Sequence, residues 1–134
     1  ILTDITGKEQ PVFSPIYDTA RALFWNRNED FFIALEKDSN SEKRITNYII
    51  NSKPKIGLEK VKNPNHFDIV NSLSRDRFLG SKDVVNELIN DKQHSLCMEL
   101  FNDELGEFYT PARKRIISKC LDLRFNLLKE ELKR

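Results

Sequence analysis

One carboxylate, Asp18, stands where this sequence could hold a metal ion. It follows an expected β-strand, residues 12–16, and precedes a segment dense in large apolar side chains that includes Phe24 and Trp25. Mg²⁺ prefers anionic oxygen ligands and commonly takes one or two protein carboxylates while keeping several waters. Asp is also a favoured helix N-cap, so Asp18 could instead cap the turn that follows it. Both roles are compatible, because a carboxylate that caps the turn with one oxygen can direct its second oxygen toward a metal ion.

The elements that would position Asp18 begin with a short β-hairpin. Residues 1–5 and 12–16 alternate apolar and polar side chains, and residues 6–10 between them form a turn in which Gly7 can take a positive φ. Two prolines, one beside and one within the second strand, limit it to the edge of a sheet. The hairpin would deliver the chain to Asp18.

A helical lobe is predicted after the hairpin, because apolar residues recur there at spacings of three and four. Asn65 with Asp68 predicts a capped helix start, and Thr110 with Pro111 predicts the start of the longest helix. We expect a mainly α-helical α+β fold in a single domain, with a hairpin over residues 1–18 and five or six helices over residues 19–134. Phe24 and Trp25 are expected to anchor either the core or the junction between the hairpin and the helices.

Composition limits the classes of function. The 134 residues are 39% hydrophobic and 32% charged, which is typical of a globular domain. No apolar run approaches a bilayer span and no signal peptide is visible, so we expect a cytoplasmic protein without membrane contact. The chain starts at Ile1 without a Met, which suggests a piece of a longer protein. Cys97 and Cys120 are expected as buried reduced thiols, with one disulfide as the alternative.

Charge is unevenly distributed, although the net charge is only +1. Residues 81–107 hold seven acids and two lysines, whereas residues 110–134 hold eight basic residues and three acids. The simplest interpretation is an acidic and a basic helix that lie side by side. The alternative is a basic face for a partner, formed by Arg113, Lys114, Arg115 and Lys119. That face lacks the interleaved aromatic residues typical of nucleic-acid sites.

Other catalytic motifs are missing from the sequence. The four glycines are far apart, which excludes a phosphate-binding loop of the Walker or dinucleotide type. His66 and His94 have no ligand partner at helical spacing, and we expect His66 to be a surface or capping residue. The 134 residues therefore contain no complete catalytic constellation.

Residues 13–21, Phe-Ser-Pro-Ile-Tyr-Asp-Thr-Ala-Arg, resemble the Tyr-Asp segment of HipA-like serine/threonine kinases. Residues 51–57, 65–67 and 113–115 are similar to a small-kinase branch of that family. The resemblance implies that this chain is part of a kinase C-terminal lobe. Asp18 would take the part of the Asp in the Asp-Phe-Gly motif and bind the Mg²⁺ that bridges the ATP phosphates. Arg21 would approach a phosphate or form a structural salt bridge.

The resemblance further implies an ATP-dependent protein kinase whose catalytic base lies upstream of Ile1, so residues 1–134 alone are expected to be inactive. ATP and Mg²⁺ would be the cofactors, a protein with Ser or Thr the substrate, and an antitoxin-like protein a partner, as in a toxin–antitoxin pair. Direct contact with nucleic acid is not expected of the kinase. The alternative function is a non-catalytic helical module that binds a protein or nucleic acid through the basic C-terminal helix.

Overall fold

The computed structural model describes residues 2–3, 9–10, 23–54, 61–75 and 80–134. Within them the chain is mainly α-helical, as predicted. The six α-helices are α1 (Glu29–Lys37), α2 (Ser41–Asn51), α3 (His66–Ser74), α4 (Ser81–Leu88), α5 (Asp91–Glu99) and α6 (Pro111–Leu132). A π-helix, η1 (Leu100–Leu105), continues α5, and a single 3-10 turn, η2 (Gly106–Phe108), follows it.

Two strands of two residues each lie near the N-terminus. β1 (Leu2–Thr3) and β2 (Glu9–Gln10) pair in antiparallel fashion. β2 falls within residues 6–10, which the sequence pattern assigns to the turn. The expected second strand, residues 12–16, lies outside the described residues, so the complete hairpin stays a prediction.

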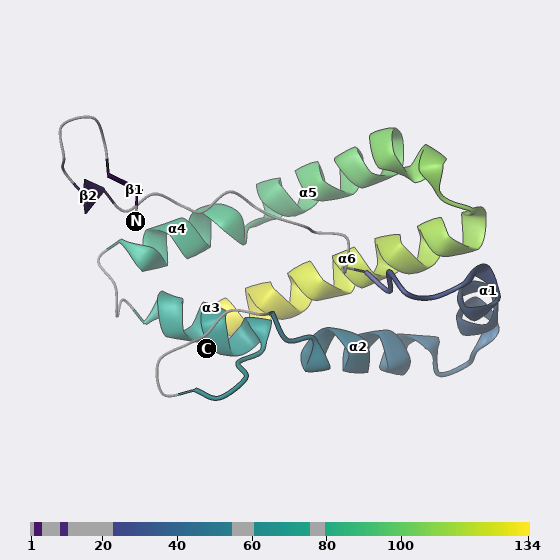
Figure 1. Ribbon diagram of the computed structural model, residues 1–134, viewed down its shortest axis with the longest axis horizontal. Coiled ribbons are helices and arrows are strands. Elements are labelled where there is room, and N and C mark those ends of the chain that lie inside the picture. The colour runs from purple at the N-terminus through teal and green to yellow at the C-terminus, as the bar shows by residue number, and fades with distance from the viewer. Residues whose placement is uncertain (1, 4–8, 11–22, 55–60, 76–79) are drawn as a thin grey trace.

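Helix α6 runs through the middle of the molecule, and most other helices contact it (Figure 1). α5 lies antiparallel along one side of α6, while α1, α2 and α3 contact α6 on the other side. α4 precedes α5 at the same edge of the molecule and contacts α3. With 22 residues, α6 is the longest helix described, as the start at Thr110 and Pro111 predicts. The Thr110 hydroxyl donates to Glu29 Oε1 rather than capping α6.

Side-chain caps fix where three of the helices begin. The side chain of Asn65 accepts from the Asp68 amide, and the Asp68 side chain accepts from the Asn65 amide, both at 2.8 Å. This reciprocal pair is the capping box that the sequence predicts for α3. Asn28 and Asn90 cap α1 and α5 by accepting from the amide three residues later. Each cap satisfies an amide that has no partner within its helix.

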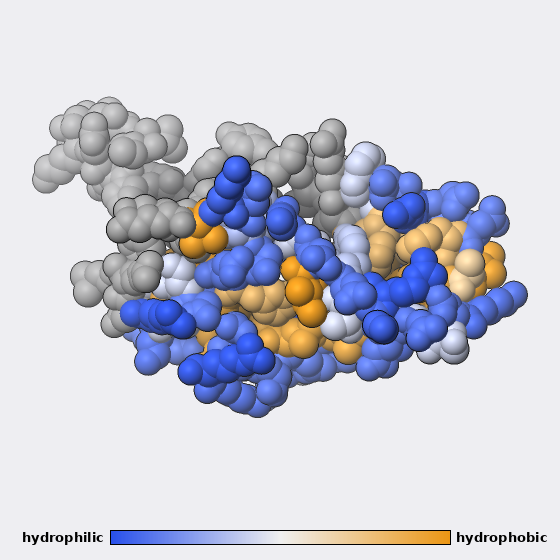
Figure 2. Space-filling model, turned by 90° about the horizontal axis from the view of Figure 1, so that it is seen from below, coloured by the Kyte–Doolittle hydropathy of each residue, from blue (hydrophilic) through white to orange (hydrophobic). Residues whose placement is uncertain are grey.

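The closed part of the core lies where α1, α2 and the first half of α6 meet. The largest fully buried side chains there are Phe32, Leu35, Ile45, Ile49 and Cys120. α3 and α5 bury no residue completely, and neither does α6 beyond Cys120. Viewed from below, hydrophobic side chains are visible between hydrophilic ones across the middle of the molecule (Figure 2). Buried side chains thus gather where α1 and α2 meet α6, whereas at the other end Val85 of α4 is buried and the apolar side chains of α3 are half-buried.

Phe24 joins the chain before α1 to this core, as predicted. Its ring is buried and stacks on Tyr48 with 3.8 Å between ring centroids, and its amide donates to the Tyr48 hydroxyl. Leu23 and Phe24 have φ values of 51° and 63°, a backbone conformation that residues with a Cβ rarely adopt. Trp25 does not anchor this core, because it is 56% exposed. A role at the junction with the hairpin stays a prediction, since residues 11–22 lie outside the described residues.

Candidate functional site

Asp18 and Arg21 lie outside the described residues, so the Mg²⁺–ATP site stays a prediction. Where the described chain resumes, Phe24, Trp25 and Asn26 line a shallow groove of about 320 Å³ together with residues of α2. Within the described ranges, no group of three or more His, Cys, Asp or Glu side chains is placed to hold a metal ion. Within the described residues, one group of polar side chains from different helices lies between α5 and α6.

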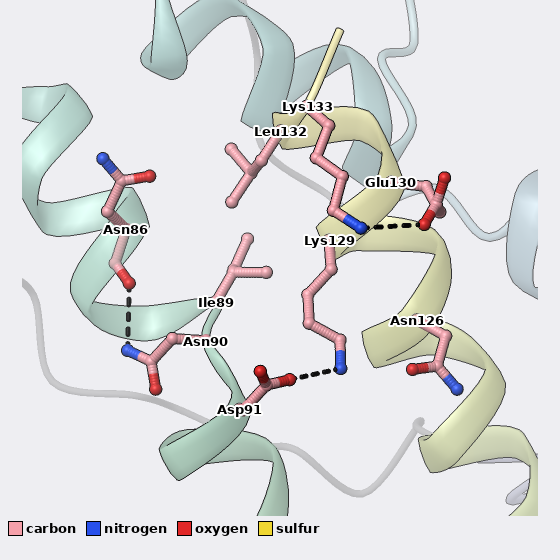
Figure 3. Close-up of a pocket in the computed structure, with 9 residues that line it drawn as sticks. All are labelled: Asn86, Ile89, Asn90, Asp91, Asn126, Lys129, Glu130, Leu132 and Lys133. Atoms are coloured by element: carbon pink, nitrogen blue, oxygen red, sulfur yellow. Dashed lines mark hydrogen bonds and ion pairs between the residues drawn. The ribbon is translucent and has the colours of Figure 1, made fainter.

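A groove of about 540 Å³ separates the α4–α5 junction from the C-terminal end of α6 (Figure 3). It is lined by Asn86, Ile89, Asn90, Asp91, Asn126, Lys129, Glu130, Leu132 and Lys133. Its two cations are paired: Lys129 Nζ lies 2.8 Å from Asp91 Oδ1, and Lys133 Nζ lies 3.2 Å from Glu130 Oε1. The hydrogen bond from Lys129 holds the pKa of Asp91 below its usual range. The groove is thus polar, with its charges largely balanced.

His94 lies one turn after Asp91 and contacts α6 through both ring nitrogens. Nδ1 lies 3.3 Å from Lys129 Nζ, Nε2 lies 3.1 Å from Asp122 Oδ1, and the ring stacks on Phe125. Because a lysine ammonium can only donate, Nδ1 is the acceptor and Nε2 carries the proton. The Nε2–Oδ1 contact is within ion-pair distance but lacks hydrogen-bond alignment, so we treat it as electrostatic.

These four side chains form one line of contacts, Asp91–Lys129–His94–Asp122, which fastens α5 to α6. Both ring nitrogens of His94 face groups of the same chain, so the ring does not present a general base to the groove. Sequence reasoning missed this cluster because Asp122 and Lys129 come from a distant helix. One local signal was available, the three-residue spacing of Asp91 and His94, and the expectation that His94 has no helix-spaced partner overlooked it.

The basic side chains at the start of α6 already form ion pairs or hydrogen bonds with other residues of the same chain. Arg113 pairs with Glu29 at 3.6 Å, Arg115 pairs with Glu36, Lys119 pairs with Glu42 at 3.3 Å, and Lys114 donates to the Asn102 carbonyl at 2.8 Å. Two guanidinium nitrogens of Arg115 hold Glu36, which lowers the pKa of that carboxyl. The sequence predicted that acidic and basic helices lie side by side, and α5 does lie along α6. Most acids that pair with the start of α6, however, come from α1 and α2. Only Asp91 of the acidic segment pairs with α6 among the described residues.

His66 and the two cysteines are the other reactive side chains among the described residues. His66 begins α3, and its Nδ1 lies 3.2 Å from the Ser52 carbonyl, which can only accept. Burial, followed by the charge of Arg124, lowers the pKa of His66. Cys97 and Cys120 are free, and burial raises the pKa of both thiols, which disfavours the nucleophilic thiolate. Both thiols are free, as predicted, but only Cys120 is buried and Cys97 is half-buried.

Comparisons with known proteins add no relatives. No family model, curated protein or solved structure matches the chain. None of the described helices combines the length and apolar character needed to cross a bilayer. A relation to HipA-like kinases therefore stays an expectation drawn from the sequence, chiefly from residues 13–21.

Proposed function

We propose that this chain is part of the C-terminal lobe of a HipA-like Ser/Thr protein kinase, in which Asp18 binds the Mg²⁺ of ATP. The observation that carries the proposal is the Tyr17–Asp18 pair within residues 13–21, directly ahead of a mainly helical body. Phe24 adds support, because it follows Asp18 by six residues and is fixed against Tyr48. The segment that carries Asp18 therefore leads to a residue, Phe24, that is packed firmly against Tyr48.

In the full-length kinase, Asp18 would hold Mg²⁺ through a charged carboxylate oxygen, and the ion would supply positive charge to the phosphates of ATP. Arg21 provides a positive group for a phosphate. The catalytic base comes from the chain before Ile1, the substrate is a Ser or Thr hydroxyl of a protein, and an antitoxin-like protein is the regulatory partner.

The test separates metal binding from helix capping. In the full-length protein, Asp18→Asn keeps a residue that caps helices about as well as Asp but removes the charge that Mg²⁺ needs. We expect Asn to weaken Mg²⁺–ATP binding by at least about tenfold, equivalent to about 1.4 kcal/mol, and to abolish autophosphorylation. The Tm should stay near that of the wild type. Titration calorimetry and phosphate incorporation measure the two effects.

Asp30→Asn is the matched control, since Asp30 is an exposed acid in the first turn of α1 and should affect neither readout. Asp18→Ala completes the series. If the Ala variant loses stability while the Asn variant binds ATP and phosphorylates like the wild type, then Asp18 is a helix cap and the kinase assignment to this residue is wrong.

The alternative function is a non-catalytic module that binds a protein or nucleic acid through the start of α6. It is the weaker proposal, because Arg113, Arg115 and Lys119 already pair with acids of the same chain. Under this alternative, affinity for duplex DNA or RNA would fall steeply with salt. Absence of binding at low salt would dismiss the nucleic-acid form of the alternative.

A further inference from the structure

An exposed stripe of apolar side chains follows α5 through η1 and η2. Its members, which we call the outer stripe, are Leu96, Leu100, Leu105 and Phe108, with exposures of 54, 45, 45 and 81%. Leu96 and Leu100 are four residues apart and share a face of the helix. The inner side of the same segment carries His94 and Phe101, which pack toward α6 and the core. Isolated surface leucines are common, but four large apolar side chains in one short segment indicate an interaction surface.

Acidic side chains flank the outer stripe without being neutralised. Residues 96–108 contain Glu99, Asp103, Glu104 and Glu107 and no Lys, Arg or His. All four acids are exposed, and none of them has an ion pair or side-chain hydrogen bond within the described chain. Lys114 reaches this region from α6, but its ammonium donates to the Asn102 carbonyl. Since like charges four residues apart repel each other, Glu99 and Asp103 do not stabilise their own helix.

We propose that the outer stripe docks a basic amphipathic helix of a partner protein. The apolar face of that helix would cover Leu96, Leu100 and Phe108, and Lys or Arg on its flanks would pair with the acids beside them. The inference depends on α5, η1 and η2 alone, so it stands or falls separately from the kinase proposal.

The same charges argue against other occupants. Four unneutralised acids repel an anionic lipid surface and the phosphates of nucleic acid. The α6 helix of a second copy is a poor occupant, because its Arg113, Arg115, Lys119 and Lys129 pair within their own chain. A separate basic helix supplies both the apolar face and the free positive charge.

The test uses full-length protein and a fluorescein-labelled Leu–Lys peptide of about 18 residues, with leucines at helical spacing. Fluorescence anisotropy should show saturable binding that weakens about fivefold or more between about 50 and 500 mM NaCl. A peptide of the same composition in scrambled order has no apolar face and should bind about tenfold more weakly.

Leu96→Ser combined with Leu100→Ser should also weaken binding about tenfold. Glu99→Gln combined with Asp103→Asn should weaken it and flatten the salt dependence.

Val84→Ser combined with Leu88→Ser is the matched control on α4, where these residues are 50 and 61% exposed. This pair should keep the affinity within about twofold, and all variants should keep the wild-type Tm because the changed residues are exposed. Equal binding of the scrambled peptide, or an equal loss from the α4 and α5 pairs, would overturn the proposal. A dimer in sedimentation that Leu96→Ser with Leu100→Ser abolishes would also overturn it, in favour of a second copy.

Discussion

At the scale of single residues, His66 shows how local surroundings select a protonation state. Its Nδ1 donates to the Ser52 carbonyl at the start of α3. Burial lowers the pKa of the ring, and the positive charge of Arg124 lowers it further, against the smaller opposing effect of the Ser52 hydrogen bond. The folded protein therefore holds His66 neutral at a pH where the unfolded chain would begin to protonate it.

His66→Gln should reduce the pH dependence of stability. The unfolded histidine binds a proton near its ordinary pKa of about 6.5, and the folded one does so only at lower pH. Between these values the unfolded state carries more protons, so the free energy of unfolding decreases as the pH falls. In urea denaturation, the free energy of unfolding should fall more between about pH 7 and pH 5.5 for the wild type than for the variant. His94 is present in both proteins, so parallel curves would contradict the assignment.

At the scale of elements, side chains within four residues of a boundary decide where several helices begin. The Asn65–Asp68 capping box and the Thr110–Pro111 start could be predicted because each depends on neighbours in the sequence. The π-helical geometry of η1 could not, since nothing in the pattern from Leu96 to Phe101 distinguishes it from a continuing α-helix. Local signals thus locate the helix starts better than they define the helix type.

Asn65→Ala should lower the free energy of unfolding by about 1 kcal/mol, because an amide at the start of α3 loses its acceptor. Asn40→Ala is the control, since Asn40 occupies the N-cap of α2 without a side-chain capping bond and should cost less than about 0.5 kcal/mol. Chemical denaturation of both variants gives the comparison. Equal losses would show that the capping box contributes nothing specific.

At the scale of the whole molecule, stability is concentrated where α1 and α2 meet α6. Leu35→Ala should lower the free energy of unfolding by about 2–5 kcal/mol, because Leu35 is fully buried and its removal leaves a cavity. Ile33→Ala on the same helix should cost about 1 kcal/mol or less, since Ile33 is 39% exposed. Similar thermal midpoints for the two variants would place the stabilising core elsewhere.

The overall class of this fold could be predicted, while its long-range pairings could not. Helical periodicity and the long C-terminal helix need only local sequence, and the structure confirms both. Glu29 and Glu36, which neutralise Arg113 and Arg115, lie far away in the sequence, so no spacing rule identifies them. The His94–Asp122 contact is hidden for the same reason. The metal-binding role of Asp18 is predicted from neighbouring residues alone. It stays a prediction because Asp18 lies outside the described residues.

The unneutralised acids of residues 96–108 also shape the electric field of the molecule. The whole chain carries +1 and this segment carries −4, so the other residues together carry +5. A charge separation of this kind gives a nearly neutral protein a dipole moment with its negative pole at the segment. The field of this dipole orients a cationic molecule that comes within about one Debye length, which is about 8 Å at physiological salt. Direction of approach is then selected before any side chains touch, which raises the rate of productive encounters.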